Sequence, residues 1–210
     1  MIASEPIEEF MDEVRARVPL AGEPDIAAAL RDAARILCRR VKLWRETRDL
    51  AVTHPAGQAL WDDDESRIAL IETARMGGRG LELRTPDWLD LEHPTWQDAP
   101  GPSGPARYVT QLVSGEVVIW PAEAGTVRMR MVLIPSRQCA TLPRFLFDDH
   151  METLGLGAAA RVLMLPNPDF ANPAYGAALD AQFRDEVDRL ATSAARLQIR
   201  APRRSRAVWF

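Results

Sequence analysis

With 210 residues, the chain is long enough for one compact domain, or for one domain carrying a smaller subdomain. Its 47% hydrophobic residues, 27% charged residues and formal net charge of −4 are ordinary for a globular protein and argue against disordered or fibrous classes. The apolar run 155–165 contains Arg161 and is far shorter than a bilayer span, so no membrane association is expected. The N-terminal residues turn acidic at once, without the layout of a signal peptide.

The charged residues are unevenly distributed along the chain, and there are only two cysteines. Residues 1–25 and the run 62–65 are acidic, whereas residues 200–210 carry four arginines and no acidic side chain. The two cysteines, Cys38 and Cys139, are interpreted as buried or incidental thiols, with a disulfide as the alternative. The chain is therefore expected to fold in a reducing cytoplasm, and its charge asymmetry is a first indication of function.

Two helices are predicted at the start of the chain. Residues 7–18 repeat apolar side chains at helical spacing and are ended by Pro19. The second helix is predicted from Pro24 to about Thr47, because proline suits a first-turn position and a long apolar stripe follows. That stripe comprises Ile26, Leu30, Ala33, Leu37, Val41 and Trp44. The arginines of this helix, Arg31, Arg35, Arg39 and Arg40, lie mostly off the stripe.

From residue 49 to 137 the hydrophobic period changes to two, which is typical of an antiparallel sheet with one buried face. The predicted hairpins pair residues 66–76 with 81–84, and 108–113 with 116–120. The clearest strand is 126–134, with Val127, Met129, Met131 and Leu133 on one face and Arg128 and Arg130 on the other. The proline-rich stretch 85–107 is interpreted as an irregular excursion whose tryptophans are half-buried.

Helical periodicity returns in the last third. Residues 145–165 form a helix that is apolar over most of its surface, so we expect it to be buried in the domain or in a subunit interface. Asn172 and Pro173 predict an N-cap and first position for a last helix that reaches about Ile199. Charged residues crowd the outer side of that helix, among them Asp185 and Asp188.

Arg161 is exceptional because it lies in the otherwise apolar helix. An unpaired buried guanidinium is costly. We therefore expect Arg161 to pair with Asp180, Asp185 or Asp188, in the same subunit or in a neighbouring one.

Residues that could perform chemistry are few and badly spaced. His54, His93 and His150 lack the spacing that places two imidazoles on one metal. Asp148 and Asp149 are better explained as favouring the first turn of a helix than as metal ligands beside His150. The run 62–65 lacks the ligand order of a calcium loop, and the glycines of 77–80 fit no phosphate-binding motif. We therefore predict no enzyme activity, no cofactor and no metal.

The segment 202–210 combines Arg203, Arg204 and Arg206 with Trp209 and Phe210. Aromatic side chains beside arginines are typical anchors for the groove of a partner protein. Two alternatives stay open, a frayed tail and a weak nucleic-acid-binding segment.

The order of these parts resembles the head-to-tail adaptor, or connector, proteins of tailed bacteriophages, in particular the tail tubular protein A type. Weak motifs carry the resemblance by their order and spacing: residues 29–35, 104–108, 118–121, 142–146, 157–163, and Phe170 to Pro173. Phe170 stands where this family usually has tryptophan. The acidic run 62–65 and the excursion 85–107 have no counterpart in the resemblance.

The resemblance agrees with the α+β fold that the order of helical, β and helical segments predicts, in which helices from both ends form one body around an inserted antiparallel β domain. The expected parts are helices in 1–48, the β domain in 49–140, helices in 141–201 and an extended C-terminal arm in 202–210. It also implies a virion protein of the neck or tail, assembled in the cytoplasm of the bacterial host.

The implied partners are further copies of the chain in a ring of about twelve, the portal protein, and a tail nozzle or stopper protein. DNA would pass through the channel without sequence-specific binding. The arm, through Arg203, Arg204, Arg206, Trp209 and Phe210, would engage the portal, while Arg161, Asp185 and Asp188 would serve subunit contacts in the helical body. The alternative is a nucleic-acid-binding packaging or regulatory protein that uses the arginine-rich tail.

Overall fold

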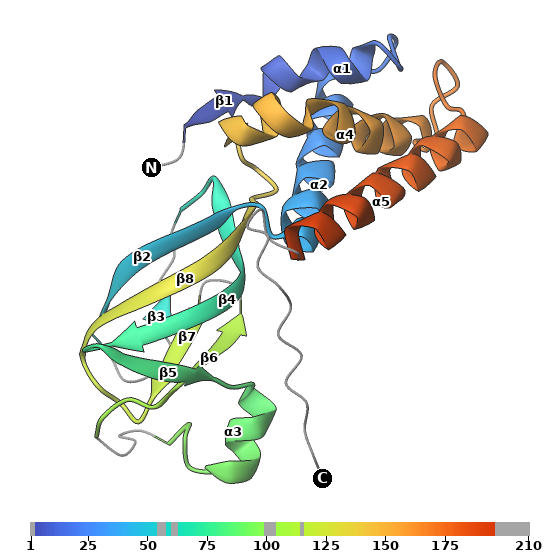
Figure 1. The fold of residues 1–210 in the computed structure, drawn as a ribbon. Coiled ribbons are helices and arrows are strands. Elements are labelled where there is room, and N and C mark those ends of the chain that lie inside the picture. Colours follow the sequence, from blue (N-terminus) through green and yellow to red (C-terminus); the bar gives the residue numbers. More distant parts are fainter. Residues whose placement is uncertain (1–2, 54–57, 60–62, 99–103, 114–115, 196–210) are drawn as a thin grey trace, which may run out of the picture.

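The computed structural model describes residues 3–53, 58–59, 63–98, 104–113 and 116–195, which form a helical body joined to a β domain (Figure 1). The helices are η1 (Ile7–Phe10), α1 (Met11–Arg15), α2 (Glu23–Val41), α3 (Pro86–Glu92), α4 (Arg144–Leu163) and α5 (Pro173–Ala195). The strands are β1 (Ser4–Pro6), β2 (Arg45–Val52), β3 (Gln58–Ala59), β4 (Ser66–Met76), β5 (Arg79–Leu83), β6 (Tyr108–Val113), β7 (Glu116–Trp120), β8 (Gly125–Pro135) and β9 (Thr141–Pro143). The predicted α+β class, with a sheet inserted between N- and C-terminal helices, is confirmed.

Helices α1, α4 and α5 pack around α2 to make the helical body (Figure 1). Small residues allow the close approach: a Cβ added to Gly157 of α4 would lie 2.8 Å from ring carbons of Phe183 on α5. Phe183 is itself almost completely buried, at 1% exposure. The expectation that α4 is buried in the domain is confirmed for its second half, whose buried residues include Leu154, Ala158, Ala159, Val162 and Leu163. Asn172 also caps α5 as predicted, since its side-chain oxygen accepts a hydrogen bond from Tyr175 N at 3.1 Å.

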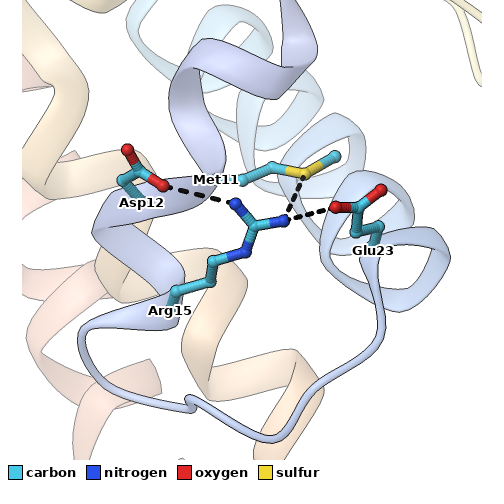
Figure 2. Close-up of polar contacts among 4 residues, drawn as sticks. All are labelled: Met11, Asp12, Arg15 and Glu23. Atoms are coloured by element: carbon cyan, nitrogen blue, oxygen red, sulfur yellow. Dashed lines mark hydrogen bonds and ion pairs between the residues drawn. The ribbon is translucent and has the colours of Figure 1, made fainter.

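Arg15 fastens the short helix α1 to the beginning of α2. Figure 2 shows its guanidinium between Asp12, at 3.3 Å, and Glu23 in the first turn of α2, at 2.6 Å, with the sulfur of Met11 at 4.0 Å. The charged side chains are largely exposed, so the ion pairs stabilise the protein only modestly, by about 1 kcal/mol or less. It fixes where α1 lies against α2.

The predicted continuation of the second helix to Thr47 is wrong. α2 ends at Val41, because Lys42 adopts the left-handed conformation with φ 58° and stops the helix. Strand β2 begins at Arg45, so the expected domain boundary after residue 48 falls inside a strand. Trp44 therefore does not extend the helical stripe, and its half-buried side chain packs against both the helical core and the sheet core.

The β domain is a sheet with strand order β2-β8-β4-β5-β6-β7-β3. Both predicted hairpins are present, and the single parallel pair among the described strands is β5 with β6. The alternation along β8 is confirmed, since Val127, Met129 and Met131 are fully buried whereas Arg128 and Arg130 point away from the core. A separate small sheet pairs β1 with β9, immediately before α4.

The stretch predicted to be irregular contains the helix α3. Thr85 caps it by accepting a hydrogen bond from Trp88 N at 3.3 Å, and Pro86 takes the first position, where it needs no hydrogen-bond partner. Half-buried aromatic rings then hold α3 against the sheet. The ring centroids of Trp88 and Tyr108 are 5.1 Å apart, and those of His93 and Trp120 are 4.3 Å apart. Within the stretch 85–107, the expectation of half-buried tryptophans is confirmed for Trp88 but is wrong for Trp96, which is buried at 6% exposure.

Candidate functional surfaces

The predicted portal-binding arm lies outside the described residues. Its named side chains are Arg203, Arg204, Arg206, Trp209 and Phe210. The last described turn of α5 ends at Ala195, at the end of the helical body that lies next to the β domain (Figure 1). The role of these five side chains stays a prediction.

Arg161 lies near the C-terminal end of α4, half-buried against α5. It donates a hydrogen bond to the carbonyl oxygen of Gly157, and its guanidinium carbon lies 5.2 Å from the ring centroid of Phe183. Burial lowers the pKa of this guanidinium, while the charges of Asp180 and Asp32 act in the opposite direction. Within the described part of the chain, Arg161 forms no ion pair, because Asp180 binds Arg184 instead, at 2.7 Å. Pairing of Arg161 with a carboxylate of another subunit stays a prediction.

Asp185 and Asp188 lie on the outer side of α5, as expected. Asp188 binds Arg40 of α2 at 3.1 Å while its side chain stays 62% exposed. Asp185 is exposed and has no ion pair among the described residues. Asp188 thus helps to hold α5 on α2 within the subunit, and Asp185 keeps its charge available at the surface.

A clamp of polar contacts joins the β domain to the helical body at residues 135–141, between β8 and α4. Glu65 accepts hydrogen bonds from the backbone N–H groups of Ala140 and Thr141, both at 2.9 Å, and from the hydroxyl of Thr141 at 3.0 Å. From the other side, Arg31 of α2 donates to the carbonyl oxygen of Cys139 at 2.8 Å. The acidic run that includes Glu65 therefore serves as a structural connection in this part of the chain.

A cavity of about 670 Å³ lies beside this clamp, between α2, β4, β6 and the end of β8, and we call it the junction groove. Its lining includes four arginines, Arg35, Arg39, Arg67 and Arg137, together with Ile68 and Ile134, and it contains no carboxylate among the described residues. Arg35 donates to the carbonyl oxygen of Pro135, at 2.5 Å. Burial lowers the pKa of Arg35, and the positive charges of Arg137 and Arg39 lower it further. The junction groove is therefore a concentration of positive charge.

The histidine and carboxylates of α4 do not form a metal site in the described part of the chain, where no cluster of three or more candidate ligands occurs. The interpretation of Asp148 and Asp149 as first-turn residues is wrong, because α4 begins at Arg144 and places them in its second turn. Burial lowers the pKa of His150, whereas Asp149 and Glu186 of α5 raise it.

Both cysteines are free and buried, as predicted. Burial raises the pKa of Cys38 to about 12 and also raises the pKa of Cys139. A thiol that stays protonated at neutral pH is a poor nucleophile and a poor metal ligand. These side chains therefore act as small apolar groups in the core.

Comparison with known protein families decides which kind of protein carries these surfaces. The family model described as SU10 adaptor protein matches residues 3–206, which include the helical body and the β domain. The chain belongs to the SU10 adaptor protein family. No curated protein matches the chain.

Membership in the SU10 adaptor family gives the protein a structural, non-enzymatic role in a phage particle, where it binds other virion proteins. The resemblance to phage adaptors is thereby confirmed at the level of the family, not of the tail tubular protein A type. Among the described helices, none has the length and apolar character needed to cross a bilayer.

The junction groove is the part of the surface of this SU10-family adaptor that sequence reasoning missed. Arg31, Arg35 and Arg39 follow one another at intervals of four, which places them on one side of α2. This row of arginines can be seen in the sequence, but by itself it is equally consistent with a helix face that is exposed to solvent. The remaining lining comes from β4, β6 and the end of β8, and only the tertiary structure brings these segments together.

Proposed function

We propose that this SU10-family adaptor forms a ring of about twelve copies that joins the portal to the tail. On the distal side, the ring meets a nozzle or stopper protein. The single observation that carries this proposal is the family match over residues 3–206. The net charge of −4 supports a further part of it, a channel through which DNA passes without being held.

The helical body supplies the contacts between subunits, with Arg161, Asp185 and Asp188 among the residues that make them. This assignment is supported by the exposed carboxylate of Asp185 and by the half-buried guanidinium of Arg161, which has no ion pair within the described chain. A cryo-electron microscopy map of the assembled neck tests it. We expect a carboxylate of the neighbouring subunit within hydrogen-bonding distance of Arg161, and an Arg161 exposed to solvent would contradict the assignment.

The arm from residue 202 to 210 binds the portal. Arg203, Arg204 and Arg206 form ion pairs with acidic groups of the portal, and Trp209 and Phe210 fill a pocket there. Burial of the two rings contributes about 2–5 kcal/mol per arm before the cost of ordering, and the ring repeats this contact many times.

Deletion of residues 203–210 tests the role of the arm. We expect the isolated subunit to unfold at the same temperature as the full chain, while docking on heads that carry the portal is lost. A matched variant that replaces only the three arginines by glutamine separates the ionic contribution from the aromatic one. Normal docking of the deleted chain would show that the arm does not bind the portal. Strongly salt-dependent binding of free DNA, lost on deletion, would instead favour a nucleic-acid-binding role.

A further inference from the structure

The junction groove contains more positive charge than the carboxylates of the described chain balance. A smaller cavity of about 270 Å³ shares Arg35, Arg39 and Arg137 with the groove and adds Arg161, and its one carboxylate is Asp32. Arg39 and Arg137 are exposed and form no ion pair among the described residues. Clustered guanidinium groups around one recess repel each other unless an anion lies between them. The arrangement is suited to an anionic group that comes from outside the subunit.

The floor of the groove indicates what kind of anion it accepts. This floor is the apolar part of the lining: Ile68 and Ile134, each 2% exposed as a whole residue, and Leu112, of which 41% is exposed. A nucleic-acid backbone presents phosphates and sugars, which gain little from an apolar floor. A protein segment that alternates carboxylates with apolar side chains matches both the arginines and the floor, because each part of it meets a complementary surface.

The first half of α4 is such a segment. Asp148, Asp149 and Glu152 are exposed on it, and we call these three residues the acidic ridge. The one ion pair of the ridge among the described residues is Asp148 with Arg144, at 3.5 Å. Phe145 lies half-buried one turn before Asp148 and Asp149, so an apolar side chain borders the acidic ridge on the same face of α4.

We propose that the junction groove of one subunit receives the acidic ridge of a second copy of the same chain. The inference rests on the proposed ring, and it names the two surfaces that meet in it. Because groove and ridge are different surfaces, the contact is head-to-tail, and it passes from each subunit to the next around a closed ring. Carboxylates of the ridge neutralise Arg39 and Arg137, and the half-buried Phe145 beside them meets the apolar part of the groove.

Charge reversal tests the groove. The double variant Arg39→Glu/Arg137→Glu changes two exposed side chains, so the subunit should fold normally, as judged by thermal unfolding. We expect at least about a tenfold loss in the number of adaptor copies bound per portal-bearing head, because like charges then face each other across the contact. The matched control is Arg75→Glu/Arg107→Glu, which makes the same change in net charge at two exposed arginines that do not line the groove and should assemble normally.

Reversing the charge of the acidic ridge, alone and together with the groove, tests whether the ridge is what binds in the junction groove. Asp149→Arg/Glu152→Arg alone should assemble as poorly as the groove variant, whereas the fourfold variant with both reversals should assemble at close to the wild-type level. Normal assembly of the groove variant would overturn the proposal. So would a groove variant that fails and is not restored by ridge reversal, because the occupant would then be another chain or DNA.

Cross-linking gives a readout that does not depend on charge. In a chain carrying both Gln138→Cys and Glu152→Cys, a short bismaleimide should join neighbours into a ladder of multimers, since the native thiols are buried. A chain with only one of these cysteines should stay monomeric. A ring seen by electron microscopy without a ladder would overturn the groove–ridge contact and leave the ring intact, whereas failure of the wild-type chain to form any ring would refute the proposed function itself.

Discussion

Gly157 lies where the ring of Phe183 crosses α4, and the absence of a side chain there makes the close packing of α4 and α5 possible. The same glycine supplies the carbonyl oxygen that accepts the hydrogen bond of Arg161. Position 157 therefore has two roles: its missing Cβ lets the two helices approach, and its backbone carbonyl holds a charged group that we assign to the subunit contact.

We expect Gly157→Ala to lower the free energy of unfolding by about 1–3 kcal/mol, because the added methyl group would lie 2.8 Å from ring carbons of Phe183. Denaturant unfolding of the isolated subunit measures this. The matched control is Gly80→Ala, where no atom lies within 4 Å of the added Cβ, so the change should stay within about 0.5 kcal/mol. Equal effects of the two substitutions would show that the α4–α5 contact is looser than described.

At the scale of elements, α4 and α5 share a titratable contact. His150 of α4 is half-buried, and burial lowers its pKa, although Asp149 and Glu186 raise it. A lowered pKa in the folded state means that the unfolded chain binds the proton more readily. The free energy of unfolding should therefore fall as pH decreases below the ordinary histidine value of about 6.5.

Denaturant unfolding at neutral pH and at mildly acidic pH tests this pH dependence. The wild-type chain should lose more stability on acidification than His150→Gln, which has no proton to bind. Glu186→Gln removes a carboxylate that raises the pKa of His150, so its pH dependence should be steeper than that of the wild type. Identical pH profiles for all three proteins would exclude a contribution from His150.

Local sequence patterns correctly predicted the helices and strands that are determined by residues close together in the sequence. The alternation of Val127, Met129 and Met131 identified strand β8, and Asn172 with Pro173 identified the beginning of α5. Lys42 gave no comparable signal, because a left-handed lysine is rare and the apolar stripe continues past it to Trp44.

The functional surfaces were harder to predict from the sequence than the helices and strands. The junction groove draws on residues from position 35 to 138, so its charge concentration arises only when α2 and the sheet meet. The parallel pairing of β5 and β6 depends in the same way on the path of the chain through α3, which proline-rich composition concealed. Pairing between segments that are distant in the sequence produces no periodic pattern in the sequence of either segment.

At the scale of the whole molecule, Glu65 determines how firmly the β domain is joined to the helical body. We expect Glu65→Gln to lower the free energy of unfolding by about 1–3 kcal/mol, because a neutral amide replaces a carboxylate that accepts from Ala140 and Thr141. Amide hydrogen exchange should also become faster in residues 136–141. Asp64→Asn, at the exposed neighbouring position, is the matched control and should leave both quantities unchanged. Unchanged exchange in Glu65→Gln would mean that other contacts hold the junction.

The chain enters and leaves the β domain at neighbouring points. Leu133 N, near the end of β8, donates a hydrogen bond to Trp44 O at 2.8 Å, just before β2 begins. An insertion whose two ends touch can be exchanged for another of different size without moving the helices on either side. Recombination between phages can therefore exchange this domain for one of another size while the helical body keeps its fold, provided that the incoming domain restores its share of the junction groove.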